Sequence, residues 1–442
     1  MSHVSHPALS WAGILRLGLV QTALGSIVVL TTAALNRVMV VEHALPAMVP
    51  GALVALHYAV QMLRPRLGHG SDQGGRRTPW IVGGMAVLGA GGILAAAATA
   101  WMGTAPIAGI ALATLAFVLV GLGVGAAGTS LLVLLASRVA PARKPAAASI
   151  VWIMMIAGFV VTTAITGRLL DPYSPERLVT VTAAVALIAF VVSLLAVTGV
   201  EGSAAARGAA TSPRTPFMVA LREVWAEPVA RHFTVFVFLS MLAYSAQDLI
   251  LEPFAGAVFG MTLGESTRLS SVQHSGVLAG MILIAVIGSL ARGSLRILRG
   301  WIVAGCLMAS AILIVLAFAH RAGEEFPLRT AFFLLGIANG AFAAAAIAAM
   351  MQLVASGHPG REGVRMGMFG AAQAIAFGLG GFLGTVLLDL GRLATGSVTS
   401  SYGIVFVADA ALFLVAATIA LRIGGAAHSR RNGFGHAATA AS

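Results

Sequence analysis

The chain has 442 residues, of which 59% are hydrophobic and only 10% charged, and its mean hydropathy is +0.95. No water-soluble fold needs so apolar a composition, so soluble enzymes and soluble binding modules are excluded. The net charge of +12 is explained by basic residues that set the orientation of membrane spans and attract anionic lipid headgroups. Nucleic-acid binding is therefore not expected.

The hydrophobic residues fall in runs near the roughly 20 residues that an α-helix needs to cross a bilayer. The first run is too long for the core of a cleaved signal peptide, so we expect the first span to be retained. Twelve spans are predicted, near residues 12–40, 46–66, 79–101, 106–137, 146–169, 178–199, 232–257, 271–291, 299–319, 328–355, 365–389 and 401–422.

Arginine and lysine concentrate in the loops that follow even-numbered spans, as in Arg76-Arg77 and Arg143-Lys144. The loops after odd-numbered spans carry acidic residues such as Asp171 and Glu265. Because basic residues in short loops stay in the cytoplasm, both termini are predicted to be cytoplasmic.

The longest hydrophilic connection follows the sixth span and predicts a linker between two six-helix bundles. A weak internal repeat supports this division, because polar residues occupy corresponding positions in the two halves. Asn36-Arg37 precedes Glu42 in the first span, and Gln247-Asp248 precedes Glu252 in the seventh. The predicted parts are an N-terminal bundle (1–200), a cytoplasmic linker (201–231), a C-terminal bundle (232–424) and a cytoplasmic tail (425–442).

The loop between the second and third spans reads Gly68-His-Gly-Ser-Asp72-Gln-Gly-Gly75-Arg76-Arg77. It resembles the signature of the major facilitator superfamily, Gly-x-x-x-Asp-(Arg/Lys)-x-Gly-(Arg/Lys)-(Arg/Lys), with Gln73 in place of the first basic residue. The resemblance implies a major facilitator fold of about 12 transmembrane helices and a gating loop that holds no substrate. An ordinary basic turn is the alternative.

Charged side chains inside spans are costly and are normally paired or functional. Arg37 and Asp248 lie at comparable heights in the two predicted bundles, counted from the basic residues below them. We therefore expect them to pair near the outer mouth of a central cavity, with Asn36 and Gln247 beside them. Independent snorkelling, or pairing within one helix, is the alternative.

Two polar stripes have helical spacing. His57, Gln61 and Arg64 share one helix face, and so do Tyr244, Asp248 and Glu252. One-sided polarity in a span predicts a face toward a cavity or another helix. The carboxylates of the second stripe would carry coupling protons, or else balance Arg37.

His57 and His274 combine placement in the membrane with a possible cavity face. Either one is a candidate axial ligand for a magnesium-bearing pigment or a proton carrier, and a hydrogen-bonded structural role is the alternative. The aqueous loops contain no Ser-His-Asp set, phosphate-binding loop or zinc-ligand spacing. An enzyme is not expected, nor a metal or cofactor built into the fold.

Several segments closely resemble the PucC/LhaA family, the bacteriochlorophyll delivery branch of the major facilitator superfamily. They are Thr32 to Glu42, Leu67 to Asp72, Arg76 to Trp80, Gln247 to Phe254 and Val258 to Thr267. The resemblance implies a multi-pass protein of the bacterial inner membrane that helps to assemble light-harvesting complexes. The implied ligand is bacteriochlorophyll or a precursor, and the implied partners are light-harvesting apoproteins or bacteriochlorophyll synthase.

Two other functions remain open. A proton-coupled transporter of a small solute would depend on Asp248 or Glu252, whereas a non-transporting assembly scaffold would be indifferent to their replacement.

Overall fold

The computed structural model describes residues 9–63, 76–140, 143–201, 217–290, 295–356 and 362–422, which form helices and no strands. Eleven of these helices are long and apolar enough to cross a membrane. A shorter apolar helix, Met48–Leu63, stands where the second span was predicted, directly before residues that are not described. The predicted all-α membrane class is confirmed, and the orientation of the termini stays a prediction.

The helices of the first half follow the predicted spans closely. They are α1 (Trp11–Val29), η1 (Leu30–Ala34), α2 (Leu35–Arg37), η2 (Val38–Glu42), α3 (Met48–Val60), η3 (Gln61–Leu63), α5 (Thr78–Met102), α6 (Pro106–Arg138), α7 (Lys144–Leu169) and α8 (Pro175–Val197).

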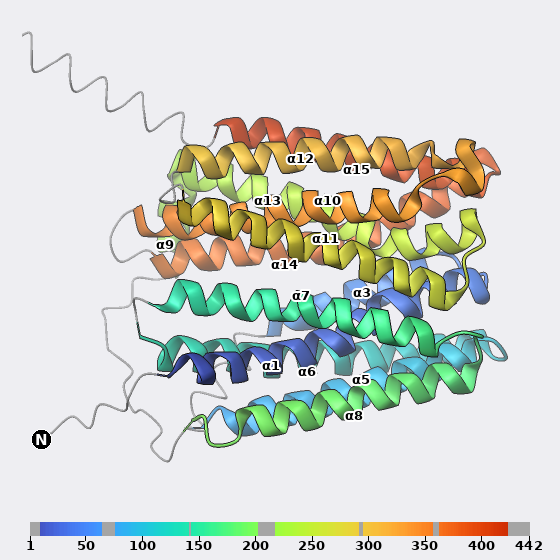
Figure 1. Ribbon diagram of the computed structural model, residues 1–442, viewed down its shortest axis with the longest axis horizontal. Helices are drawn as coiled ribbons and strands as arrows, with labels where there is room; N and C mark the ends of the chain where they lie inside the picture. Colours follow the sequence, from blue (N-terminus) through green and yellow to red (C-terminus); the bar gives the residue numbers. More distant parts are fainter. Residues whose placement is uncertain are drawn as a thin grey trace, which may run out of the picture. The chain divides into compact units, whose positions relative to one another are not determined.

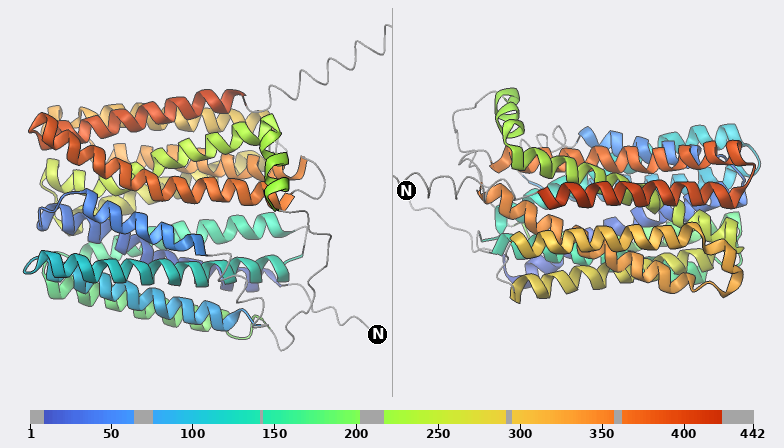
Figure 2. Two further views of the ribbon diagram at one scale, coloured as in Figure 1. Left: turned by 180° about the vertical axis from the view of Figure 1, so that it is seen from behind. Right: turned by 90° about the horizontal axis from the view of Figure 1, so that it is seen from above.

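The second half begins with a short helix inside the segment predicted as a linker. Its helices are α9 (Phe217–Ala226), α10 (Pro228–Phe259), α11 (Leu263–Leu290), α12 (Leu295–Ala317), η5 (Ala319–Glu325), α13 (Leu328–Ser356), α14 (Glu362–Thr395) and α15 (Val398–Arg422). Figure 2 shows α9, in light green, lying crosswise to the neighbouring helix α14, which it contacts.

The chain divides into two compact units. The first contains residues 1–209 together with 249–275, and the second contains residues 210–248 together with 276–442. The division therefore runs through α10 and through α11, and residues 249–275 of this helix pair belong to the first unit. The domain boundaries predicted from the sequence stay predictions.

Helix ends follow local capping chemistry. Ser10 accepts a hydrogen bond from Gly13 N at the start of α1, and Ser174 accepts one from Arg177 N at the start of α8. Proline occupies the first turn of α5, α6, α7 and α8, where its missing N–H costs nothing. These signals explain why the predicted boundaries of most spans lie within a few residues of the observed ones.

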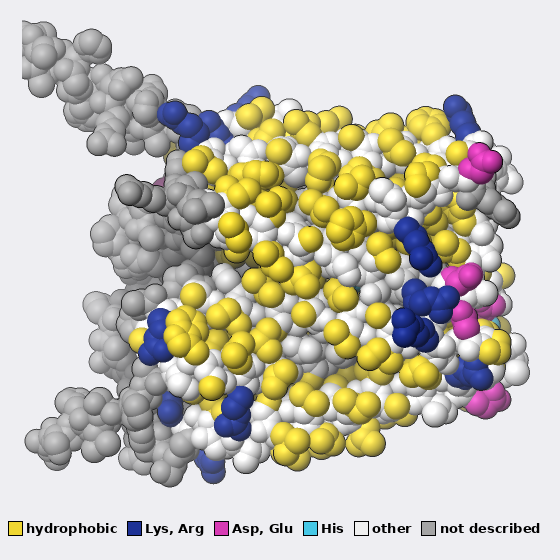
Figure 3. All heavy atoms as spheres, in the orientation of Figure 1, with side chains coloured by type: hydrophobic (Ala, Val, Ile, Leu, Met, Phe, Trp, Pro, Cys, Tyr) yellow, Lys and Arg dark blue, Asp and Glu magenta, His cyan; other side chains and the backbone are white. Residues whose placement is uncertain are grey.

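Within the first unit, α5 lies between α6 and α8 (Figure 1). Glycine brings the backbones of α5 and α6 into contact, because a Cβ at Gly84 would lie 2.5 Å from Ala127 N and one at Gly123 would lie 2.5 Å from Leu88 N. Hydrophobic side chains cover the middle of the helices, and charged side chains gather toward their ends (Figure 3). This is the pattern expected of helices in lipid.

Candidate functional site

The first span changes its helical geometry where its polar residues begin. Two π-helical turns, η1 and η2, flank the short α-helical segment that contains Asn36 and Arg37. In a π-turn residues i and i+5 lie above one another, and Arg37 forms an ion pair with Glu42, five residues further on. The π-turn therefore brings a carboxylate to a guanidinium that an α-helix would place on a different face.

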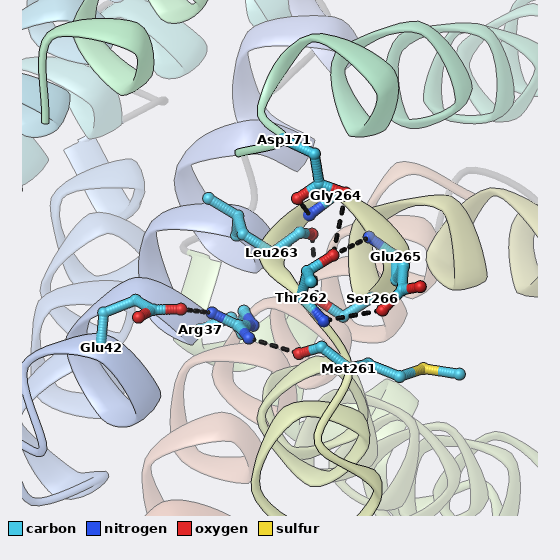
Figure 4. A network of polar contacts seen from close by, with 9 residues as sticks. All are labelled: Arg37, Glu42, Asp171, Met261, Thr262, Leu263, Gly264, Glu265 and Ser266. Carbon is cyan, nitrogen blue, oxygen red and sulfur yellow. Dashed lines mark hydrogen bonds and ion pairs between the residues drawn. The ribbon is translucent and has the colours of Figure 1, made fainter. Parts of the chain in front are cut away.

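Arg37 is buried, with 2% of its surface exposed, and it has a second partner. Its Nη2 donates to the backbone oxygen of Met261 at 2.6 Å, beyond the end of α10 (Figure 4). Gly256 makes room for it, because a Cβ at that position would lie 3.1 Å from both Nε and Nη2 of Arg37. A carboxylate, a carbonyl and a glycine together accommodate this charge.

Asn36 donates a hydrogen bond to α10, at a backbone carbonyl that a proline leaves without its helical donor. Pro253 has no N–H, so the Leu249 carbonyl one turn earlier lacks its α-helical donor. Asn36 Nδ2 donates to this carbonyl at 2.6 Å. Asn36, Arg37, Glu42, Leu249 and Met261 form what we call the Arg37 junction, where three of the family-like segments noted in the sequence meet.

A second polar group lies directly beside the Arg37 junction, at the start of α11 (Figure 4). Thr262 and Glu265 form a capping box: Glu265 Oε2 accepts from Thr262 N at 2.9 Å, and Thr262 Oγ1 accepts from Glu265 N at 3.2 Å. Asp171, after α7, accepts from Gly264 N at 2.9 Å and from Thr262 Oγ1 at 2.8 Å. Arg268 approaches Asp171 at 3.8 Å.

This cap explains why α11 begins eight residues before the predicted span. Its first turns are polar, and hydropathy alone assigns them to a loop. They are helical because α7 and α10 supply partners. Arg268 donates to Gly167 O at 3.0 Å and Ser271 Oγ donates to Val160 O at 3.0 Å, both on α7, and Ser270 Oγ donates to Glu252 Oε1 on α10. The Thr-x-x-Glu pattern at 262–265 was the sequence signal that would have found this start.

Tyr173 connects the turn after α7 with the Arg37 junction electrostatically. Burial raises the pKa of Tyr173 to about 12, the negative charge of Glu42 adds to this effect, and the positive charge of Arg37 opposes it. The Tyr173 hydroxyl is buried and makes no hydrogen bond within the described part of the chain. The phenol is therefore neutral at physiological pH.

Glu252 and His274 lie on either side of Ser270, on α10 and α11. Ser270 Oγ donates to Glu252 Oε1, and Nδ1 of His274 lies 2.8 Å from the Ser270 backbone oxygen. The imidazole meets the ring of Phe159 edge-on, with centroids 5.1 Å apart. Glu252 and His274 are 2% and 4% exposed. The structure thus brings together two predicted site residues from different spans.

His57 and Gln61 contact one another, as their i, i+4 spacing predicts. The Gln61 amide nitrogen lies 2.8 Å from Nε2 of His57, so it donates to that nitrogen and uses its lone pair. Both side chains are buried. Arg64, the third member of the stripe, lies outside the described residues.

Tyr244, Gln247 and Asp248 belong to the second unit. Tyr244 contacts the rings of Phe342 and Phe377, and Gln247 is fully buried. The predicted pairing of Arg37 with Asp248 stays a prediction, and the partners found for Arg37 match the alternative of a pair within one helix.

Most of the predicted gating loop cannot be compared with the structure. Gly68, Asp72 and Gly75 lie outside the described residues. Arg76 is described and exposed, and Arg77 directly precedes α5 and is partly buried.

Glu201 is a site residue that the sequence did not reveal. It follows α8, yet its carboxylate accepts hydrogen bonds from Arg77 N, from Thr78 N at 2.8 Å and from Thr78 Oγ1 at 2.7 Å, at the start of α5. Burial alone would raise the pKa of Glu201, but the hydrogen bonds from Arg77 and Thr78 outweigh it, and the pKa is lowered. Arg138 also donates to the Glu201 backbone oxygen at 2.7 Å.

Two buried polar residues of the second unit were also missed. Asn339 in α13 and Asp409 in α15 are 0% and 3% exposed. Neither amide atom of Asn339, nor Oδ2 of Asp409, has a hydrogen-bond partner among the described residues. An acid in the middle of the last hydrophobic span was a visible signal for Asp409.

The described residues contain no group of three or more His, Cys, Asp or Glu side chains that would hold a metal ion. The first unit offers buried polar side chains that bind backbone carbonyls, and the imidazoles of His57 and His274 each lie next to an aromatic ring. This arrangement suits binding and conformational control.

Comparison with known sequences gives consistent matches. The family model described as "PUCC protein" matches residues 34–427. The chain is 51% identical over 415 residues to the "Bacteriochlorophyll synthase 44.5 kDa chain" of Rhodobacter capsulatus, covering 93% of this chain and 95% of that protein. It is 30% identical over 436 residues to "Protein PucC" of Cereibacter sphaeroides, covering 95% and 93%.

Solved structures show the same fold at low sequence identity. A bacterial homolog of the human lysosomal transporter Spinster matches with a TM-score of 0.66 and 16% identity over 93% of this chain and 96% of that one. The peptide transporter POT in complex with sulfate matches with a TM-score of 0.67 and 15% identity over 96% of both chains. These matches confirm the predicted major facilitator fold and carry no information about substrate.

Proposed function

Since the chain belongs to the PUCC protein family, we propose that it assists the assembly of photosynthetic light-harvesting complexes by binding bacteriochlorophyll and delivering it to antenna apoproteins. It acts in the bacterial inner membrane and does not catalyse a reaction. The name of the relative that is 51% identical supports a link to bacteriochlorophyll synthesis, with the synthase as a further partner.

The observation that carries the pigment-binding step is the tautomer of His274. A backbone carbonyl only accepts hydrogen bonds, so Nδ1 of His274 carries the proton that it shares with Ser270 O at 2.8 Å. The lone pair is then on Nε2, which makes no hydrogen bond to any described residue. Histidines that ligate metals generally donate their other N–H to a carbonyl or carboxylate in this way.

His57 is the weaker of the two candidates. Its Nε2 accepts from the Gln61 amide, so that lone pair is already used. The imidazole of His274 therefore fits the magnesium of a bacteriochlorophyll better, and Phe159 offers an aromatic edge beside it. When the pigment is bound, this side chain would hold its magnesium through Nε2.

Absorption spectroscopy of the purified protein tests the proposal. The protein in mild detergent should bind added bacteriochlorophyll and shift its absorption bands. His274→Ala should lose this shift, and free imidazole should restore it in His274→Gly. His57→Ala is the matched control and should retain the shift.

A magnesium-free form of the pigment separates two kinds of failure. It should bind equally to the wild type and to His274→Ala, because only the magnesium needs the imidazole. Protein that binds neither form of the pigment contradicts delivery itself. If His274→Ala shifts the absorption of the magnesium pigment as the wild type does, pigment binding stands and only His274 is wrong as the magnesium ligand.

The transporter alternative has its own readout. A proton-coupled transporter would show gradient-dependent uptake in vesicles that is lost in Asp248→Asn or Glu252→Gln. A deletion strain with normal near-infrared antenna absorption, together with such uptake, would favour transport over delivery.

A further inference from the structure

An apolar groove runs between α5 and α6, away from the Arg37 junction and from His274. Its volume is about 490 Å³, within the range of roughly 300–1,000 Å³ that is common for ligand sites. Residues spaced by three or four positions line it from both helices, so each helix contributes one face. They are Pro79, Trp80, Gly83, Gly84, Val87, Leu119, Leu122 and Ala126.

Two adjacent glycines give the groove its depth. Gly84 brings α5 against the backbone of α6, since a Cβ there would lie 2.5 Å from Ala127 N. Gly83 is exposed, and a Cβ on it would meet nothing within 4 Å. The close contact between the backbones of α5 and α6 forms the floor of the groove. Because Gly83 has no side chain, the groove stays open above this floor. Its long direction follows the helices, which suits a linear hydrocarbon chain.

The end of the groove at the start of α5 is basic. Arg76 is exposed and precedes the lining residues Pro79 and Trp80 by three and four positions. The nearby Glu201 carboxylate accepts from the backbone N–H groups of Arg77 and Thr78, and the positive charge of Arg76 also acts on it. Tryptophan is enriched at the headgroup level of membranes, so Trp80 places this end of the groove at the interface.

We propose that this groove binds one acyl chain of an anionic membrane phospholipid, with the phosphate beside Arg76. The apolar walls and the open Gly83 accommodate the chain, and the guanidinium complements the charge of the headgroup. The proposal does not depend on pigment binding, because none of its residues takes part in the His274 site. It assigns a lipid site to the face of the first unit that α5 and α6 form.

Native mass spectrometry of the full-length protein tests this, with phosphatidylglycerol and phosphatidylcholine offered at equal concentration. The wild type should retain phosphatidylglycerol in preference, by about fivefold for one arginine near the headgroup. Gly83→Leu fills the groove and should abolish retention of both lipids. Arg76→Gln should keep retention but equalise the two lipids.

Gly300→Leu is the matched control. Gly300 lies in α12, is also exposed, and a Cβ there also meets nothing within 4 Å, but it is not among the residues that line this groove. This variant should retain lipid as the wild type does. Leu122→Trp fills the groove from α6 and should reproduce the loss, which guards against a folding defect peculiar to Gly83→Leu.

The opposite results overturn the proposal. If Gly83→Leu and Leu122→Trp retain as much phosphatidylglycerol as Gly300→Leu, the lipid lies elsewhere. If Arg76→Gln keeps the preference for phosphatidylglycerol, the phosphate is not beside Arg76. If these variants lose bound pigment while lipid retention stays unchanged, the occupant is a pigment tail and the phospholipid assignment is wrong.

Discussion

Glu42 at the Arg37 junction and Glu201 at the start of α5 are carboxylates of the first unit that lie near helix ends, and they are stabilised in different ways. Glu42 pairs with a guanidinium that is 2% exposed, whereas the Glu201 carboxylate is held by backbone N–H groups and one hydroxyl. At the Arg37 junction, removal of Glu42 leaves a buried guanidinium without its counter-charge. At Glu201 only a helix cap is lost.

The comparison teaches that the cost of a substitution here depends on the group left behind. A buried ion that loses its partner is far more costly than a helix N-terminus that loses its cap. The expected effects therefore decrease from the Arg37–Glu42 pair, through the Asn36–Leu249 bond, to the Glu201 cap.

Glu42→Ala should have the largest effect. It leaves the buried Arg37 without a counter-charge, which we expect to lower the free energy of unfolding by about 3–5 kcal/mol. Arg37→Met leaves only Glu42, which is 32% exposed, and should cost less. The double variant should recover part of the loss of Glu42→Ala. Chemical unfolding in mixed micelles measures all three.

An Arg37→Met variant that loses as much stability as Glu42→Ala, without recovery in the double variant, would show that Arg37 acts mainly through Met261. The cost of these substitutions would then come from the lost hydrogen bond between Arg37 and the Met261 carbonyl, and not from the Arg37–Glu42 ion pair.

Asn36→Ala should have an intermediate effect. It leaves the Leu249 carbonyl without a donor in a buried position, at an expected cost of about 1–3 kcal/mol. In a Pro253→Ala background the helix regains an N–H for this carbonyl, so the same Asn36→Ala change should cost less. A double-mutant cycle in the same unfolding assay measures the coupling, and additive effects would contradict the proposed role of Asn36.

Glu201→Gln should have the smallest effect, about 1 kcal/mol, as is typical of a helix cap. Because the folded-state pKa of Glu201 is lowered, its contribution is present above the unfolded pKa and is lost as pH falls through the folded value. The difference in stability between wild type and Glu201→Gln should therefore be full at pH 7 and shrink below about pH 4.5. A difference that does not change with pH would contradict the assigned cap.

The spans were predictable because membrane helices satisfy their own backbone hydrogen bonds and must be about 20 residues long. The start of α11 was not predictable from hydropathy, since its polar first turns are stabilised by α7 and α10. The shared helix face of His57 and Gln61 was predictable from helical spacing alone, whereas the contact of His274 with Phe159 depends on how α7 meets α11.

The sequence by itself determined the membrane class, the family and the polar positions Asn36, Arg37 and Glu252, because hydrophobicity and motif spacing are local properties. Only the tertiary structure decided what these side chains bind. Arg37 Nη2 finds its acceptor 224 residues away, and the Asn36 amide finds its own 213 residues away. Both acceptors are backbone carbonyls, which every residue carries, so no side-chain pattern marks them; their availability depends on Pro253 and on the turn after α10.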